Sequence, residues 1–383
     1  MTEVSIAACP EYSRERCRQA LLEVLEPLGG LDWVKPGMTV AIKANLVGAM
    51  KPEEAGTTHP TLLCALVELL KERGAEVIIG DSPGGLFTEA YVSKIYKATG
   101  MHMTEEVGAR LNHDYSQAGA EYPEAAVAKS FQYTAWLDKA DAIINFSKLK
   151  SHGMMSMSNA AKNMFGVIPG TMKPEYHFRF PDPKDFARMI VDLDEYFKPV
   201  LSITDAVIGM EGNGPTNGTP KFIGAVLAAH SPHKLDLACT RILGLQRQDV
   251  PTLEAALERG LIPEQPEELE IAGALADFVL TDFQKVETLN SHLFRNKANG
   301  AMGDFIGDVM QRALTSVPKV KKAECVGCGY CAKICPAKAI TMINKLPKID
   351  RKKCIRCFCC QEFCPKGAMK VHRPVIAKVL NKL

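Results

Sequence analysis

Eight cysteines near the C-terminal end of the chain fall into two runs with identical spacing. Each run reads C-x2-C-x2-C-x3-C-P and is closed by Pro336 or Pro365. The cysteines are Cys325, Cys328, Cys331 and Cys335 in the first run, and Cys354, Cys357, Cys360 and Cys364 in the second. With this spacing, three thiolates of a tight loop bind one [4Fe–4S] cluster and the fourth cysteine binds the neighbouring cluster. The sequence therefore predicts two [4Fe–4S] clusters.

The crossing of the fourth cysteine predicts the ligand sets. These are Cys325, Cys328, Cys331 and Cys364 for one cluster, and Cys354, Cys357, Cys360 and Cys335 for the other. A zinc ribbon would need four ligands per site but gives no reason for the duplicated spacing, and disulfide frameworks are typical of small secreted domains. We therefore favour iron–sulfur clusters over both alternatives. Cys359 falls outside the pattern, and we interpret it as a packed thiol.

Composition narrows the class of protein. A chain of 383 residues with 46% apolar content can bury a large core and is expected to hold two or three domains. No apolar run approaches the roughly 18–20 residues of a membrane span, and residues 1–10 show no signal-peptide pattern. Five of the 13 cysteines remain outside the two runs, an odd number that favours reduced thiols. We therefore expect a cytoplasmic protein.

Charge is unevenly distributed along the chain. From Lys319 to the end there are 16 Lys and Arg against 3 acidic residues, a balance of +13, which leaves 30 against 41, or −11, for the rest. Basic segments are often typical of nucleic-acid binding. Here we favour charge compensation of the clusters, packing on the acidic domain, or docking of an acidic redox partner of the ferredoxin or flavodoxin type. We expect no nucleic acid as a partner.

A change of composition near residues 317–318 predicts the main domain boundary. We expect an α/β ligand domain over residues 1–318, a two-cluster ferredoxin domain over 319–373 and a basic tail over 374–383. In the first domain, apolar strands alternate with amphipathic helices, a pattern typical of a parallel α/β sheet. The expected strands are 39–46, 75–80, 142–146, 200–210 and 222–229, and the expected helices are 14–28, 60–73, 156–165, 185–197 and 235–243.

Polar side chains gather where these strands end, which is where open α/β sheets bind ligands. Lysine, asparagine and histidine donors predominate, so we expect an anionic ligand. The residues expected to bind it are Lys43, Asn45, Thr58, Ser82, Lys148, Asn159, Lys162 and Asn163, and the candidates for proton transfer are His59, Asp81 and His152. Asn159, Lys162 and Asn163 would share one face of the helix over 156–165.

Each of these residues also has a purely structural interpretation. Lys43 could extend its ammonium group to the surface, Asp81 could stabilise a turn, and His59 could cap the helix that starts at Pro60. The sequence contains no G-x-x-x-x-G-K-[ST] loop, no G-x-G-x-x-G fingerprint, no G-x-S-x-G elbow and no H-E-x-x-H helix. ATP hydrolysis, dinucleotide binding by that fingerprint and serine hydrolysis therefore have no support, while a flavin held by other contacts is left open.

Several segments occur together in one known family. They are Lys43-Ala44-Asn45-Leu46, Thr57-Thr58-His59-Pro60, Gly80-Asp81-Ser82-Pro83, Lys148-Leu149-Lys150-Ser151-His152, Asn159-Ala160-Ala161-Lys162-Asn163-Met164-Phe165-Gly166, Asp205, Met210-Glu211-Gly212-Asn213-Gly214-Pro215 and Leu235-Asp236. With them the chain resembles the domain of unknown function 362 family over residues 38–275. Members of that family often carry a fused two-cluster ferredoxin module. The resemblance implies a shared architecture and site but no particular reaction.

Three functions follow as hypotheses. The first is a redox enzyme in which electrons pass through the clusters to an anionic small molecule held in the α/β domain. The second is an electron carrier or redox subunit whose large domain is a docking platform for a partner protein. The third is a non-redox protein in which the clusters are structural or sense oxidation.

Overall fold

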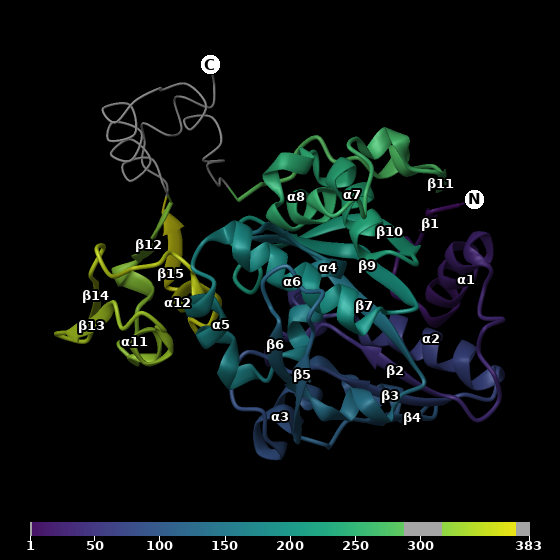
Figure 1. Ribbon diagram of the computed structural model, residues 1–383, viewed down its shortest axis with the longest axis horizontal. Helices are drawn as coiled ribbons and strands as arrows, with labels where there is room; N and C mark the ends of the chain where they lie inside the picture. The colour runs from purple at the N-terminus through teal and green to yellow at the C-terminus, as the bar shows by residue number, and fades with distance from the viewer. Residues whose placement is uncertain (1, 287–315, 373–383) are drawn as a thin grey trace.

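A computed structural model describes residues 2–286 and 316–372. Within these residues one nine-stranded sheet dominates the structure (Figure 1). Its strands follow the order β11 (Ile271–Ala272), β1 (Val4–Ala8), β10 (Thr219–Ala229), β9 (Leu201–Glu211), β7 (Ala142–His152), β2 (Thr39–Lys43), β3 (Glu76–Gly80) and β4 (Ala109–Leu111), and β8 (Ser156–Ser158) pairs with β7.

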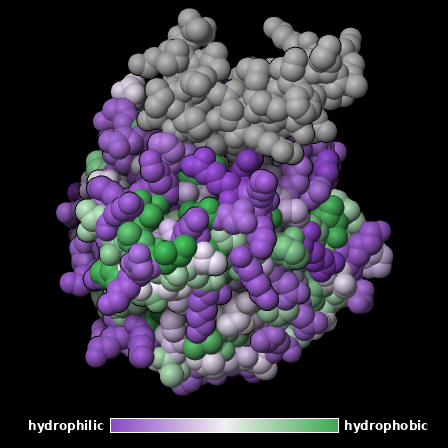
Figure 2. All heavy atoms as spheres, turned by 90° about the vertical axis from the view of Figure 1, so that its left-hand side faces the viewer, coloured by the Kyte–Doolittle hydropathy of each residue, from purple (hydrophilic) through white to green (hydrophobic). Residues whose placement is uncertain are grey.

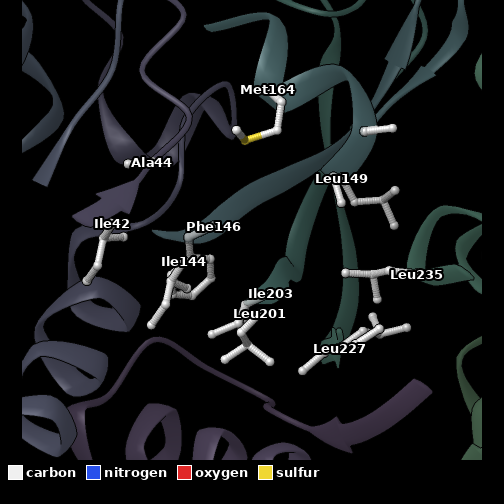
Figure 3. Packing of buried hydrophobic residues seen from close by; sticks show 14 of the residues in the cluster. Ile42, Ala44, Ile144, Phe146, Leu149, Met164, Leu201, Ile203, Leu227 and Leu235 are labelled. Atoms are coloured by element: carbon white, nitrogen blue, oxygen red, sulfur yellow. The ribbon is translucent and has the colours of Figure 1, made fainter. Parts of the chain in front are cut away.

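The sheet is mixed but mostly parallel. Strands β9, β7, β2, β3 and β4 run parallel to one another, while β10 is antiparallel to both β9 and β1. The central strands are apolar on both faces, as expected for a sheet covered by helices. Ile42, Ile144, Phe146, Ile203 and Leu227 belong to this core and are at most 1% exposed (Figure 3). The expected α/β class is confirmed.

Two groups of helices pack on the sheet. Helices α1 (Arg14–Leu25) and α2 (Pro60–Glu72) contact each other and the strands β1, β3 and β10. In the second group, α4 (Ala160–Asn163) contacts β7 and β9, and α7 (Pro232–Leu243) contacts β9 and β10. Helices α6 (Pro183–Phe197) and α8 (Pro251–Glu258) pack against each other, α6 also against α4 and α8 also against α7. Figure 1 shows α7 and α8 separated from α1 and α2 by strands of the sheet.

The remaining elements of the large domain are short. Helices α3 (Glu89–Thr99) and α5 (Lys173–Arg179) follow β3 and α4 in the chain. Strands β5 (Gln117–Glu121) and β6 (Ser130–Thr134) form a separate antiparallel pair. In the described residues, no helix is long and apolar enough to cross a membrane.

The segment expected as a helix over 156–165 differs from that expectation. Residues Ser156–Ser158 form strand β8, which pairs with the last three residues of β7, and the helix α4 covers only Ala160–Asn163. A carboxylate from another helix explains where α4 begins, because Asp236 accepts hydrogen bonds from the backbone N–H groups of Ala160 (2.8 Å) and Ala161 (3.2 Å). This contact over a long sequence separation was not visible in the local pattern.

The C-terminal module consists of two similar halves. Strand β12 (Val317–Val320) pairs with β15 (Met369–His372), and β13 (Ile340–Ile343) pairs with β14 (Leu346–Ile349), both antiparallel. Helices α11 (Tyr330–Ile334) and α12 (Cys359–Glu362) each follow the second cysteine of one run and contact each other. The expected basic tail, 374–383, lies outside the described residues.

Candidate functional site

One apolar cavity of the module is lined by four cysteines from both runs. Cys325, Cys328, Cys331 and Cys364 surround it together with hydrophobic side chains such as Met342. Cys364 reaches this cavity from the second run. The set is the one that the interleaved assignment predicts, so the residues fit the cluster expected there.

The second set of thiols lies beside the first. Cys360 and Cys331 share a small buried cluster, against which Cys335 of the first run also packs. Burial raises the pKa of Cys360, and the thiols of Cys357, Cys354, Cys335 and Cys331 raise it further. Thiols from both runs therefore lie near Cys360 as well.

Cys359 is not among the residues that line the cavity around Cys328. It is fully buried and makes a side-chain hydrogen bond with Cys357. No disulfide bond joins any of the cysteines in the described residues.

In the large domain, four of the expected site residues form one buried network. The ammonium group of Lys43 lies 2.8 Å from Asp81 Oδ1 and donates to Asn163 Oδ1 at 2.9 Å. Asn45 Nδ2 donates to the same Asn163 oxygen at 2.9 Å, and Lys150 donates to Asn45 Oδ1 at 2.9 Å. Burial lowers the pKa of Lys43, whereas Asp81 opposes that shift. Asp81 also accepts from the backbone of Leu46 and of its neighbour along the chain, so it stabilises the turn after β3 as well as the ion pair.

Glycine is required where this network meets the next turn. A Cβ atom on Gly166 would lie 2.3 Å from both Lys43 Nζ and Asp81 Oδ1. Only a residue without a side chain permits this close approach of the backbone. Gly166, within the short helical turn Met164–Val167, therefore belongs to the site.

Lys148 belongs to a second network, on the side of His59. Its ammonium group donates to Asp205 Oδ2 at 2.9 Å and to the Tyr12 hydroxyl at 2.8 Å. The Tyr12 ring stacks on His59 with centroids 3.6 Å apart, and burial lowers the pKa of His59 to about 4. His59 Nδ1 also accepts from the Thr61 N–H, so it caps α2. Sequence reasoning did not select Tyr12.

Thr58 and Asn159 have internal partners. The Thr58 hydroxyl accepts from the Asn45 N–H and donates to the carbonyl oxygen of Phe146. Asn159 accepts hydrogen bonds from Ser147 and Thr204 and donates to the Cys239 sulfur at 3.2 Å. It therefore points away from Lys43, and Asn159 and Asn163 do not share the single polar face that the expected helix would have given them.

His152 presents an unused donor. Its Nδ1 accepts hydrogen bonds from the backbone N–H groups of Met154 (3.0 Å) and Met155 (3.1 Å), which places the ring proton on Nε2. That Nε2 is buried and has no hydrogen-bond partner among the described residues. Burial, with Lys162 and His177 nearby, holds the pKa of His152 well below its usual range. His152 is therefore a neutral donor.

Sequence reasoning missed Lys173 and His177 on α5. The Lys173 ammonium group donates to the carbonyl oxygens of Ser82 (2.5 Å) and Ile168 (2.7 Å), and burial lowers its pKa to about 7. Burial likewise lowers the pKa of Lys150 to about 7. His177 is buried, stacks on Phe186 at 4.2 Å, and has its pKa lowered to about 3 by burial and by Lys162. Only the basic and aromatic character of 173–180 could have pointed to α5.

Helix α12 of the module lies against this part of the large domain. Gln361 Nε2 donates to the carbonyl oxygens of Asn213 (3.1 Å) and Gly214 (3.2 Å), and Thr216 donates to the carbonyl oxygen of Glu362 at 2.8 Å. A Cβ on Gly153, next to His152, would meet side chains of the module within 3.0 Å, and one on Gly84 would overlap the ring of Phe363. Burial lowers the pKa of Lys150 and of Lys162, and the carboxylate of Glu362 acts in the opposite direction on both. The helix that carries Cys360 thus borders the lysine network.

Comparisons with known proteins decide the family. The model of the family described as Domain of unknown function (DUF362) matches residues 40–241, which is more than half of the chain. The chain belongs to this family. A second model, described as a 4Fe-4S dicluster domain, matches residues 324–368 of this DUF362 protein. It is therefore an iron–sulfur protein that binds [4Fe–4S] clusters.

A curated relative supports the same family. The DUF362 protein is 32% identical over 271 residues to a thylakoid-associated protein of Synechocystis sp., in an alignment that covers 69% of this chain and 81% of the relative.

Two solved structures are similar at low identity. The lactate racemase apoprotein of Thermoanaerobacterium thermosaccharolyticum gives a TM-score of 0.43 at 10% identity, covering 64% of this chain and 58% of that one. A Thermotoga maritima protein gives 0.35 at 14% identity, with 56% and 55% covered. The chain spans little more than half the length of each.

Proposed function

We propose that this protein passes electrons through two [4Fe–4S] clusters to an anionic small molecule bound in the α/β domain. The observation that carries the proposal is the position of α12, which holds Cys360, contacts the loop after β9 through Gln361, and acts electrostatically on Lys150 and Lys162 through Glu362. When bound, the clusters would supply single electrons. The electrostatic effect of Glu362 on these lysines supports transfer from the module into the α/β domain.

The residues of the large domain have separate roles in this proposal. The lysines bind and orient the anion, and their charge favours the extra negative charge that arrives with electrons. His152 offers a buried Nε2–H beside them, which makes it the best-placed of the three expected proton donors. Asp81 holds Lys43 in place, and His59 caps α2 near Lys148. Asp81 and His59 therefore have positioning roles in this proposal and are also candidates for proton transfer.

An acidic redox protein of the ferredoxin or flavodoxin type is the expected electron donor. The segment from Lys319 onward has a balance of +13, which would steer a partner of opposite charge. Figure 2 views the molecule from the left-hand side of Figure 1, where the module lies, and shows apolar residues between hydrophilic ones on that face. Val326 of the module is 61% exposed and lines the cavity that holds Cys328.

The test starts from protein purified without oxygen. Two clusters predict about eight iron atoms per chain. Mass spectrometry of the small molecules that stay with the protein, before and after reduction by dithionite, should then reveal an anion that has gained electrons. Zinc in place of iron would overturn the cluster assignment. Reducible clusters without any retained or reduced small molecule would overturn the proposed acceptor.

A second candidate function is an electron carrier whose large domain is a docking platform. The exposed Val326 and the basic charge of the module favour it, because both suit a protein partner. Under this function, reduced protein would give its electrons to a second protein and to no small molecule.

A further inference from the structure

We propose that the ligand of the α/β domain is a compact dianion, a phosphate monoester or a dicarboxylate, held by an oxyanion receptor of Lys162, Lys173, His152, His177 and Ser82. This inference rests on the proposed function and deepens it by naming the substrate class. In the described residues, Lys162, His152, His177 and Ser82 each have a side-chain nitrogen or oxygen without a hydrogen-bond partner, which the network around Lys43 does not. Lys173 and His177 lie on α5.

The ring of Phe165 is the centre around which the receptor is built. The ammonium groups of Lys162 and Lys173 lie 5.5 Å and 5.7 Å from its centroid, and His177 packs edge-on at 5.7 Å between centroids. Cations and the positive edge of another ring are both attracted to the negative face of an aromatic ring. Phe165 thus gathers three nitrogen-bearing side chains from two helical segments.

Buried polar atoms of the receptor lack partners. Ser82 Oγ, His152 Nε2 and His177 Nδ1 are buried without a hydrogen bond to any residue that the structure describes. Lys162 is partly exposed, and its ammonium group donates no hydrogen bond within the described ranges. The three buried unpaired atoms are costly in a folded protein, and together they indicate a group that binds there. Ser82 O–H, the Nε2–H of His152 and the ammonium of Lys162 are all donors, so the missing group is an acceptor.

The balance of charge indicates that the acceptor carries two negative charges. Asp81 is already paired with Lys43 at 2.8 Å. Three further lysines of the site have no such partner among the described residues: Lys150, Lys162 and Lys173. The carboxylate of Glu362 raises the pKa of all three, against the larger effect of burial. Three ammonium groups against one carboxylate leave an excess of two when all are ionised. A dianion cancels that excess, whereas a monoanion leaves one buried charge without a counter-charge.

The depressed pKa values agree with a receptor that lacks its anion. Burial lowers the pKa of Lys173 and Lys150 to about 7 and also lowers that of Lys162. A bound dianion would favour the charged form of each lysine, so its binding should be accompanied by uptake of protons near neutral pH.

The experiment is calorimetric titration of the oxidised, cluster-loaded full chain with inorganic phosphate, with malonate and with acetate. We expect saturable binding of at least one dianion and binding of acetate at least about tenfold weaker, since one charge-assisted contact is lost. Lys162→Met should weaken binding of the dianion by about tenfold or more. Lys94→Met, an exposed lysine on α3, is the matched control and should bind as the wild type does.

A second variant distinguishes loss of a binding group from loss of folding. His152→Asn can keep an acceptor for the N–H groups of Met154 and Met155 while removing the Nε2–H, so it should retain iron and still bind the dianion more weakly. Unchanged affinity in both Lys162→Met and His152→Asn would overturn the receptor, as would equal affinity for acetate and the two dianions.

The titration separates this inference from the proposed function because oxidised protein transfers no electrons. Dianion binding that Lys162→Met weakens, in a protein that reduces no small molecule, would support the receptor and overturn the redox role. A retained, reducible small molecule that neither phosphate nor malonate displaces would overturn the receptor and leave the redox role standing.

Discussion

Gln361 donates from its side-chain amide to the carbonyl oxygen of Gly214 at 3.2 Å, and this contact joins the helix after Cys357 to the loop after β9. The same Nε2 also donates to the carbonyl oxygen of Asn213. Gln361 is 1% exposed, so its loss would leave two backbone acceptors without their partner inside the protein. Gln361 therefore supplies two of the hydrogen bonds that hold the module against the large domain, beside the one that Thr216 donates to the carbonyl oxygen of Glu362.

Gln361→Ala should loosen the module from the large domain. We expect a cost of about 1–3 kcal/mol, because buried acceptors lose their donor. Hydrogen exchange should become faster in residues 211–217, while iron content stays at the wild-type value. Gln117→Ala on the exposed strand β5 is the control. Wild-type protection of 211–217 in Gln361→Ala would show that other contacts hold the module.

The ion pair between Lys43 and Asp81 should be costly to break. Both side chains are at most 4% exposed, so Lys43→Met leaves a buried carboxylate without its counter-charge. The free energy of unfolding should fall by about 3–5 kcal/mol. The double variant Lys43→Met with Asp81→Asn should recover part of that loss. Lys71→Met, which breaks a surface pair with Glu76, should cost less than about 1 kcal/mol and serves as the control in urea unfolding.

Adjacent cysteines in α12 should behave differently. Cys360 is expected to bind a cluster, so Cys360→Ala should lower the iron content from about eight to about four atoms per chain. Cys359 is fully buried but falls outside the ligand pattern, so Cys359→Ala should keep the full iron content. Iron and sulfide analysis of protein prepared without oxygen measures both. Loss of iron in Cys359→Ala alone would reverse the assignment of ligands.

The part of the site that could be predicted from the sequence is the part built on strands. Lys43 interrupts an apolar strand near its carboxyl end. In a parallel sheet, the carboxyl ends of neighbouring strands lie side by side, and this does not depend on how the helices pack. Asp81, Asn45 and Lys150 follow the same rule, and the structure joins them in one network. Strand order alone thus placed these residues together.

The missed part depends on contacts between distant segments. Lys173 and His177 lie on the short helix α5, whose sequence has the charged and aromatic composition of a surface segment, yet both are buried against Phe165. The helix expected over 156–165 was shortened by β8 and by the cap from Asp236, 76 residues away from Ala160. Local periodicity carries no information about such partners.

The buried lysine of α5 should make stability depend on pH. The pKa of Lys173 is about 7 in the folded protein and about 10.4 in an unfolded chain. Between these values the unfolded state binds more protons, so this residue makes the stability of the wild type rise as pH increases from 7 towards 10. Lys173→Met removes the contribution, and the gain in the urea midpoint between pH 7 and pH 9 should be smaller in that variant than in the wild type. Lys94→Met should keep the wild-type gain, and an equal gain in Lys173→Met would mean that Lys173 stays charged when folded.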